Sequence, residues 1–325
     1  MIPKIAYSRP RTLRQAITDL SVPGTILHAG GTDLLGCLRD GVITNDRIIS
    51  ISALSGLRGI ARTKDGGLRI GALTTLSEVA ADPIIREHYA ALAQGAGSAA
   101  SPQLRNQGTL GGNLCQRPRC WYFRGEFHCL RKGGKMCYAA GGQNEYHCIF
   151  GGENCFIVHP SDTAAPLAAL DARVRVAGQR GTKTVPIEAF FIGPGRDIRR
   201  ENILVPGEIL TEILLPAPEA ALRSSYRKVR GRGAWDFALA GVALALRLAG
   251  SRVEAARVVL SGVAPVPWRV KGAEKALAGK SVDDEAALAA ATAAVQDAQP
   301  LANNAYKTDL VRGIVFESLM ALGRE

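Results

Sequence analysis

The sequence predicts an α+β protein in which two small α/β lobes precede a C-terminal α+β domain. Its 325 residues exceed the length at which one hydrophobic core usually stops growing. Short strand-like and helix-like segments alternate over the first part of the chain, as in α/β units. A proline-rich joint at residues 214–218 separates this part from long apolar runs and alanine-rich segments. We therefore expect domains at 1–56, 57–217 and 218–325.

The expected elements follow from hydrophobic periodicity and turn residues. In the first lobe they are a helix at 12–20 and strands at 25–29 and 47–51. In the second lobe they are a strand from residue 68, a helix beginning at Ser77, one continuous helix over 86–100, a helix followed by a strand within 162–176, and a strand and turn at 185–191. The last domain should contain strands within 226–229, 237–248 and 256–261, followed by helices.

Composition narrows the class of protein. Hydrophobic residues make up 47% of the chain and mean hydropathy is +0.05, so wholesale disorder is excluded. The charge sum is 40 Lys and Arg minus 29 Asp and Glu, or +11. Such a surplus favours an anionic partner, for example a phosphate-bearing cofactor, an acidic protein surface or a nucleic acid.

The sequence shows no targeting segment and no membrane span. The first ten residues carry charges and two prolines, whereas a secretory signal needs an uninterrupted apolar core. The longest apolar stretch, 238–246, contains Gly241 and is closed by Arg247, far short of the roughly 20 apolar residues of a spanning helix. We expect a cytoplasmic, reducing location; a partner that carries an export signal would move the complex to the periplasm.

Two glycine-rich runs are candidates for phosphate binding. Gly30 and Gly31 follow an apolar strand, and Gly111 and Gly112 precede Asn113. Small residues let backbone N–H groups approach phosphate oxygens, although either run on its own is also typical of a plain tight turn. Neither run matches the dinucleotide fingerprint or the P-loop.

Six of the seven cysteines fall between positions 115 and 155, and Cys37 lies apart. Clustered thiols in a reducing compartment indicate a metal or iron–sulfur site rather than a disulfide framework. The spacing allows a [4Fe–4S] cluster, a tetrahedral zinc site or unliganded thiols. His128 and His147 are interpreted as surface or hydrogen-bonding residues. The surrounding residues 115–158 lack a helical or strand period, so we expect an irregular insertion.

One alternative belongs to a different class of function. Basic residues alternate with aromatic residues inside the insertion, an arrangement that suits single-stranded nucleic acid. A zinc-stapled nucleic-acid-binding protein would use Trp121, Tyr122 and Phe123 together with Arg117, Arg119, Arg124, Arg131, Lys132 and Lys135.

Four collinear motifs resemble the FAD-binding subunit of the molybdenum hydroxylases, the family of xanthine dehydrogenase, aldehyde oxidoreductases and carbon monoxide dehydrogenase. They are residues 29–34, residues 104–114, residues 159–162 leading to 169–172, and residues 226–229. The resemblance implies a two-lobed FAD-binding domain of the vanillyl-alcohol-oxidase type (PCMH), followed by a C-terminal domain of the CO-dehydrogenase flavoprotein type.

The resemblance also implies roles for single residues. FAD contacts are expected from Leu27, His28, Ala29, Gly30, Gly31, Thr32, Asp33, Leu34, Thr109, Gly111, Gly112, Asn113, Asp162, Leu210 and Lys228. Leu210 could instead pack in the core without contacting FAD, and Lys228 could instead belong to a solvated basic face. The insertion is similar to that of two branches, the periplasmic aldehyde oxidoreductase flavoprotein subunit and 4-hydroxybenzoyl-CoA reductase. That similarity implies a [4Fe–4S] cluster on Cys120, Cys129, Cys137 and Cys155, and it leaves Cys37, Cys115 and Cys148 without a role.

The implied activity is electron transfer. Substrate would be oxidised at a molybdenum–pterin centre in a large partner subunit, and electrons would pass through two [2Fe–2S] clusters of a small subunit to FAD in this chain. An external acceptor, NAD, quinone, ferredoxin or O2, would take them up. Aldehydes are the leading substrate class, with xanthine or other N-heterocycles and 4-hydroxybenzoyl-CoA as alternatives. No nucleophile–base pair of the Ser-His-Asp or Cys-His kind is recognised, so no catalytic residue is assigned in this chain.

Overall fold

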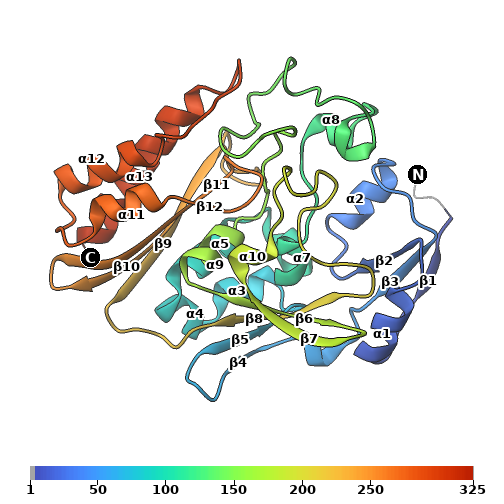
Figure 1. Ribbon diagram of the computed structural model, residues 1–325. Helices are drawn as coiled ribbons and strands as arrows, with labels where there is room; N and C mark the ends of the chain where they lie inside the picture. Colours follow the sequence, from blue (N-terminus) through green and yellow to red (C-terminus); the bar gives the residue numbers. More distant parts are fainter. Residues whose placement is uncertain (1–3, 325) are drawn as a thin grey trace.

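The computed structural model describes residues 4–324, which form three β-sheets (Figure 1). The first sheet has three parallel strands in the order β1 (Ala6–Ser8), β3 (Arg47–Ser50), β2 (Thr25–His28). Parallel strands need crossover connections, and the helices α1 (Leu13–Leu20) and α2 (Leu34–Arg39) supply them. The first glycine run therefore follows the carboxyl end of β2, the end of a parallel strand at which ligands commonly bind.

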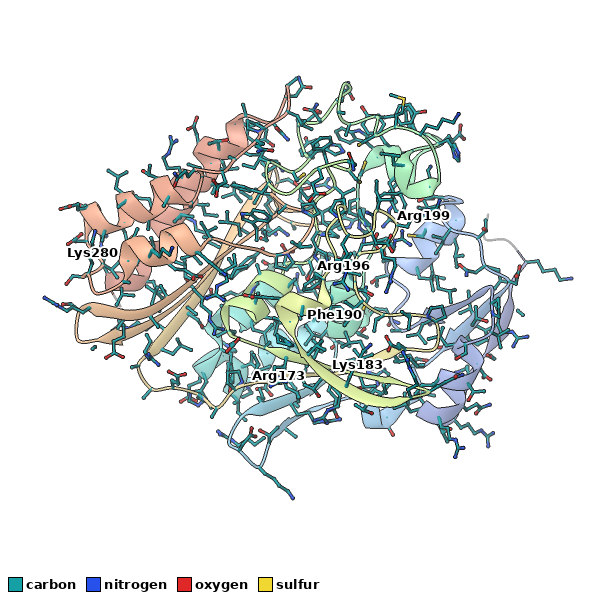
Figure 2. The ribbon with its side chains drawn as sticks, in the orientation of Figure 1. Arg173, Lys183, Phe190, Arg196, Arg199 and Lys280 are labelled. Carbon is teal, nitrogen blue, oxygen red and sulfur yellow. The ribbon has the colours of Figure 1, made fainter. Side chains whose placement is uncertain are left out.

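The second sheet is antiparallel and has five strands. Their order is β4 (Ile60–Arg62), β5 (Leu68–Gly71), β8 (Ile209–Leu215), β6 (Arg173–Gly178), β7 (Gly181–Pro186). Short helices pack beside it, namely α3 (Leu76–Ala81), α4 (Pro83–His88), α5 (Ala90–Ser98), α6 (Pro102–Gln107), α7 (Leu110–Leu114), α9 (Ala164–Ala169) and α10 (Ile187–Phe190). Phe190 is fully buried in this core, whereas Arg173 on β6 and Lys183 on the edge strand β7 are exposed (Figure 2).

The third sheet is also antiparallel, in the order β12 (Trp268–Arg269), β11 (Arg252–Ser261), β10 (Ala240–Ala249), β9 (Leu222–Val229). Helices α11 (Lys271–Leu277), α12 (Asp284–Ala293) and α13 (Tyr306–Arg324) cover its outer face (Figure 1). Along β10, Ala243 and Ala245 join the core of the second sheet, while Val242 and Leu244 join the core under these helices. Burial on both faces explains the continuous apolar run in this strand.

The predicted α+β class is confirmed, and one predicted helix is wrong. The stretch 86–100 is two helices, α4 and α5, because Tyr89 between them leaves helical geometry with φ −133° and ψ 47°. Its buried side chain donates a hydrogen bond from the hydroxyl to the carbonyl of Pro216, 2.6 Å away. The interruption of the helix thus coincides with a contact to a distant part of the chain. Helix propensity in an alanine-rich segment does not predict such a contact. The turn expected after the strand near 185 is the short helix α10.

Residues 115–158 contain only α8 (Trp121–Arg124) and a single 3-10 turn at Leu130–Lys132, so the expectation of an irregular insertion is confirmed. Its carboxyl half is fixed to the C-terminal domain. Ile149 and Phe150 donate backbone hydrogen bonds to the carbonyl of Val263 and belong to the core under α12 and α13. Among residues 4–324, no helix combines the length and the apolar content needed to cross a bilayer.

A buried lysine joins α13 to the insertion. Lys307 is fully buried, and its Nζ donates to the carbonyls of Gly262 at 2.8 Å and Tyr146 at 3.2 Å. Burial lowers the pKa of Lys307 from 10.5 to about 8. Because the folded-state pKa is the lower one, the unfolded chain binds more protons between about pH 8 and 10.5, and stability rises with pH across that window.

Replacing Lys307 with methionine should remove this rise. Relative to the variant, the free energy of unfolding of the wild-type chain should increase by on the order of 2 kcal/mol between pH 8 and pH 10. Urea unfolding followed by circular dichroism at several pH values measures the difference. Lys280 is exposed, and its substitution by methionine serves as the control. Parallel curves for wild type and Lys307→Met would contradict the prediction.

Candidate functional site

The two glycine runs meet at one cavity of about 260 Å³. Residues 29–34 line one side and Thr109, Gly111 and Gly112 line another, with Leu27 and Leu210 also at the wall. Eleven of the fifteen residues expected to contact FAD therefore share this cavity: Leu27, Ala29, Gly30, Gly31, Thr32, Asp33, Leu34, Thr109, Gly111, Gly112 and Leu210. His28, Asn113, Asp162 and Lys228 lie outside its lining.

Close backbone approach explains the glycines of this cavity. A Cβ at Gly30 would collide with the backbone carbonyl oxygen of Gln107, and a Cβ at Gly111 would lie 2.8 Å from the Cβ of Ala72. Gly31 has φ +74°, a left-handed conformation that favours glycine. Only glycine therefore fits where the backbone of each run approaches its neighbour, and all three of these glycines line the cavity.

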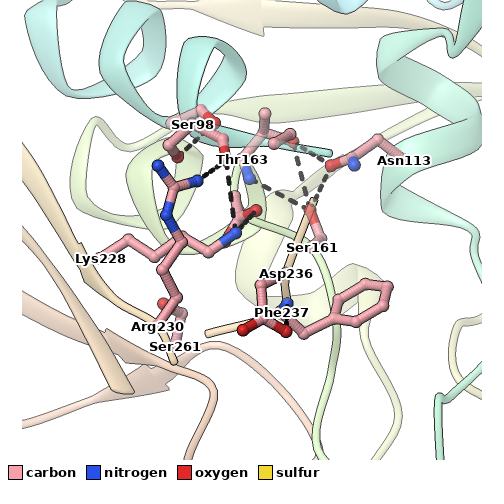
Figure 3. A network of polar contacts seen from close by, with 12 residues as sticks. Ser98, Asn113, Ser161, Thr163, Lys228, Arg230, Asp236, Phe237 and Ser261 are labelled. Carbon is pink, nitrogen blue, oxygen red and sulfur yellow. Dashed lines mark hydrogen bonds and ion pairs between the residues drawn. The ribbon is translucent and has the colours of Figure 1, made fainter. Parts of the chain in front are cut away.

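The remaining residues of the second run hold it in place. The Oγ1 of Thr109 accepts a hydrogen bond of 3.1 Å from the backbone N–H of Gly112. The Oδ1 of Asn113 accepts from the hydroxyls of Ser161 at 2.5 Å and Thr163 at 2.7 Å (Figure 3). Asn113 therefore connects the glycine turn to the start of α9.

His28, at the end of β2, is partly buried, and its Nδ1 lies 3.3 Å from the Oγ of Ser50. Burial lowers the pKa of His28.

Asp162 and Lys228 form a buried ion pair between the second and third sheets. Their side chains are 5% and 3% exposed, and the Nζ of Lys228 is 2.7 Å from Oδ2 of Asp162 (Figure 3). Tyr226 donates its hydroxyl to the other carboxylate oxygen at 3.0 Å, and Lys228 also donates to the carbonyl of Ser98 at 3.3 Å. Burial raises the pKa of Asp162, and the charge of Lys228 opposes that shift. The alternative of a solvated face for Lys228 is therefore wrong.

Four cysteines line a second, small cavity of about 10 Å³ inside the insertion. They are the four expected ligands, Cys120, Cys129, Cys137 and Cys155. The other cavity-lining residues are mostly apolar and aromatic, among them Tyr122, Phe123, Leu130, Tyr138, Phe156 and Ile157. The three remaining cysteines lie elsewhere: Cys37 and Cys115 line the first cavity, and Cys148 is buried outside both. All seven are free thiols.

The thiols of the second cavity differ in acidity. A hydrogen bond from Cys155 and backbone N–H groups of residues 139, 140 and 156 lower the pKa of Cys137 to about 6. Burial raises the pKa of Cys120 to about 11, and donating its proton to Cys137 raises that of Cys155. Within residues 4–324, no three His, Cys, Asp or Glu side chains converge as on a single metal ion. A [4Fe–4S] cluster has a different demand, because each thiolate binds its own iron.

Two carboxylates outside the insertion, those of Asp33 and Glu201, form ion pairs with its arginines. Asp33 accepts from the guanidinium groups of Arg124 at 2.7 Å and Arg119 at 3.0 Å, and from the backbone N–H of Arg117 at 2.7 Å. Glu201 is buried and pairs with Arg117 and Arg131. The carbonyl of Arg199 beside the insertion accepts from Arg117 at 3.3 Å (Figure 2).

These pairs change the interpretation of the basic residues in the insertion. Four of its arginines are held by Asp33 and Glu201, and the side chain of Arg131 is only 1% exposed. Phe123 is buried, with Arg117 and Arg131 stacked over its ring. The proposed basic and aromatic surface for nucleic acid is therefore wrong for these residues. Sequence reasoning missed Glu201, for which no motif gave a signal.

His147 is a further residue at the second cavity. It is 3% exposed, and its Nε2 lies 3.2 Å from the Sγ of Cys120. Burial, with a smaller contribution from the charge of Lys307, lowers the pKa of His147 to about 4. The expectation that His147 is a hydrogen-bonding residue is confirmed, whereas His128 is exposed.

Comparison with known families covers nearly the whole chain. Residues 3–218 match the FAD binding domain in molybdopterin dehydrogenase, and residues 224–322 match the CO dehydrogenase flavoprotein C-terminal domain. The aldehyde oxidoreductase FAD-binding subunit PaoB of Escherichia coli K12 is 37% identical over 94% of this chain and 94% of that protein. The medium chain of carbon monoxide dehydrogenase from Hydrogenophaga pseudoflava is 29% identical over 98% and 97% of the two chains.

Solved structures show the same fold. A carbon monoxide dehydrogenase structure from Hydrogenophaga pseudoflava, which lacks the Mo-pyranopterin moiety, superimposes with a TM-score of 0.79 at 29% identity, covering 99% of this chain and 98% of that chain. Quinoline 2-oxidoreductase from Pseudomonas putida 86 gives the same TM-score at 23% identity, covering 100% and 98%. The motifs, the cavities and the fold thus point to one family.

Proposed function

Because this chain belongs to the family of FAD-binding medium subunits of molybdenum hydroxylases, we propose that it is the electron-transfer subunit of an aldehyde-oxidising complex. The aldehyde assignment rests on the 37% identity to an aldehyde oxidoreductase subunit. Relatives named as xanthine dehydrogenase subunits are 30% identical, and they make N-heterocycle oxidation the second candidate. The domain limits 1–56, 57–217 and 218–325 are part of this proposal.

The observation that carries the proposal is the cavity between the two glycine runs. Four glycines, Gly30, Gly31, Gly111 and Gly112, line its walls, and a backbone without side chains can come close to the diphosphate of FAD. Residues 27–34 would wrap the diphosphate, and Thr109 with the turn at 111–113 would contact the diphosphate and the flavin side. When bound, FAD accepts single electrons from iron–sulfur centres and delivers them to an external acceptor. Asp162, Leu210 and Lys228 would contribute further FAD contacts.

We also propose that the second cavity binds a [4Fe–4S] cluster through Cys120, Cys129, Cys137 and Cys155. The four thiols share one apolar cavity, and the low pKa of Cys137 provides a thiolate at neutral pH. The insertion has almost no regular hydrogen-bonded structure of its own. A cluster there would staple the insertion by supplying folding energy, a role that we favour over an electron relay.

The partners follow from the same family relationship. Several relatives are named as medium chains or subunits of multi-subunit enzymes. We infer a large subunit with molybdenum–pterin and a small subunit with two [2Fe–2S] clusters as the source of electrons. The acceptor would be NAD, quinone, ferredoxin or O2.

An absorption spectrum and one pair of glycine variants test the proposal. The purified chain should show flavin bands near roughly 370 and 450 nm and a broad iron–sulfur shoulder. Gly30→Ala places a Cβ against the Gln107 carbonyl, and overpacking of about 1 to 3 kcal/mol should weaken FAD binding by about 5- to 150-fold.

Gly36→Ala is the matched control, because a Cβ at that position in α2 meets no atom within 4 Å. Its flavin content should equal that of the wild type. A colourless wild-type protein would overturn the proposal. Equal FAD affinity in the Gly30 variant and the wild type would exclude the glycine cavity as the FAD site.

A further inference from the structure

His147 brings a second kind of polar group to the four-cysteine cavity. Its imidazole lines that cavity, and its Nε2 lies 3.2 Å from the Sγ of Cys120. We therefore interpret His147 as a hydrogen-bonding partner of the Cys120 sulfur and not as a fifth ligand of the cluster.

The direction of this hydrogen bond follows from the chemistry of the two groups. A cysteine bound to iron is a thiolate and has no proton to donate. The contact is therefore favourable only when Nε2 carries a proton. The other ring nitrogen, Nδ1, is buried and makes no hydrogen bond with the described residues. The tautomer with the proton on Nε2 thus fits both ring nitrogens.

The imidazole is held in this position from several sides. Trp121 packs edge-on against it with ring centroids 5.6 Å apart, and Tyr122 lies at 6.0 Å. The side-chain amide of Asn304 donates to the carbonyls of His147 and Cys148, each at 3.1 Å. Lys307 holds the preceding carbonyl, that of Tyr146, at 3.2 Å. The C-terminal domain therefore fixes the backbone that presents the imidazole to Cys120.

We propose that His147 is a positioning residue that donates a hydrogen bond from Nε2 to the thiolate of Cys120 and thereby raises the reduction potential of a [4Fe–4S] cluster in this cavity. The inference rests on the cluster assignment made above. A donor at a ligand sulfur withdraws negative charge from it, which stabilises the more negative, reduced form of the cluster. The same donor orients the first ligand of the insertion.

The experiment compares two histidine variants of the full-length chain. His147→Phe keeps an aromatic ring and removes the donor, and His128→Phe is the matched control at an exposed position of the same insertion. Iron content is measured first, and the midpoint potential of the cluster is then determined by a redox titration followed by EPR. We expect full iron content and a lower potential in His147→Phe, with an unchanged potential in His128→Phe.

The possible results separate the two proposals. An iron-free wild-type chain overturns the cluster and the hydrogen bond together. An iron-replete His147→Phe chain with the wild-type potential overturns the role of His147 and leaves the cluster intact. A lowered potential in both variants also overturns it, because the effect would then be unspecific.

A measurement on the wild-type chain covers the case in which His147→Phe fails to assemble. With ¹⁵N-labelled histidine, pulsed EPR of the reduced cluster should detect one coupled imidazole nitrogen. The coupling should persist in labelled His128→Phe. Its absence from the iron-replete wild type, or its loss in His128→Phe, would overturn the proposal.

Discussion

Replacing Cys137 with serine is expected to remove the iron of the insertion, about four atoms per chain. A hydrogen bond from Cys155 and three backbone N–H groups stabilise the thiolate of Cys137 and lower its pKa to about 6. A serine hydroxyl stays protonated at neutral pH and is a poor ligand for a soft iron–sulfur site. Iron analysis per chain and the absorbance of the iron–sulfur shoulder measure the loss.

Cys148→Ala is the matched control for this experiment. Cys148 lies in the same insertion and is buried, yet it does not line the four-cysteine cavity. Its variant should keep its iron and lose only a small amount of stability. Full iron in Cys137→Ser, or loss of iron in Cys148→Ala, would contradict the ligand set.

Loss of the cluster should also weaken the ion pairs of Asp33, which lines the first cavity. Arg119 precedes the short helix α8 and Arg124 is its last residue, and both bind Asp33 in the first glycine run. An insertion without its staple would hold these arginines less firmly, and Asp33 would then lose the partners that neutralise it. Much of the positive charge of the insertion thus neutralises carboxylates of the same chain.

The sequence was sufficient for the α+β class and for most elements, because their signals are local. Strand β8 was not assigned. Its residues 209–215 contain Thr211 and Glu212 within an apolar run, and its central place in the sheet depends on pairing with β5 and β6, which lie far away in the chain. Strand formation of that kind is decided by tertiary partners. The break at Tyr89 has the same cause, a hydrogen bond to a residue 127 positions away.

The candidate site shows the same division. Motifs indicated the glycines, because close backbone approach permits few other residues, and the family resemblance pointed to the four cysteines that line the second cavity. The pairing of Asp33 and Glu201 with arginines of the insertion could not be read from the sequence, because the paired residues are 70 to 91 positions apart. Four arginines that look like part of a surface patch in the sequence are thus partners of the carboxylates of Asp33 and Glu201.

Replacing Lys228 with methionine is expected to destabilise the chain by about 3 to 5 kcal/mol, because it leaves the carboxylate of Asp162 buried without its counter-ion. The hydroxyl of Tyr226 would remain as a donor, 3.0 Å from Oδ1 of Asp162. For a chain of this size the loss corresponds to a decrease in Tm on the order of 10 °C. Thermal unfolding followed by circular dichroism measures it, together with the flavin content of each variant.

Two further variants separate stability from cofactor binding. Arg227→Met on the same strand breaks an ion pair with Glu317 that is half exposed, and it should change stability by less than about 1 kcal/mol. The double variant Asp162→Asn/Lys228→Met removes both charges and should recover most of the lost stability. If it also recovers flavin content, the pair acts by joining the second and third sheets. If flavin stays low in a stable double variant, Lys228 or Asp162 contacts FAD directly, and an unchanged Tm in Lys228→Met would contradict the buried pair itself.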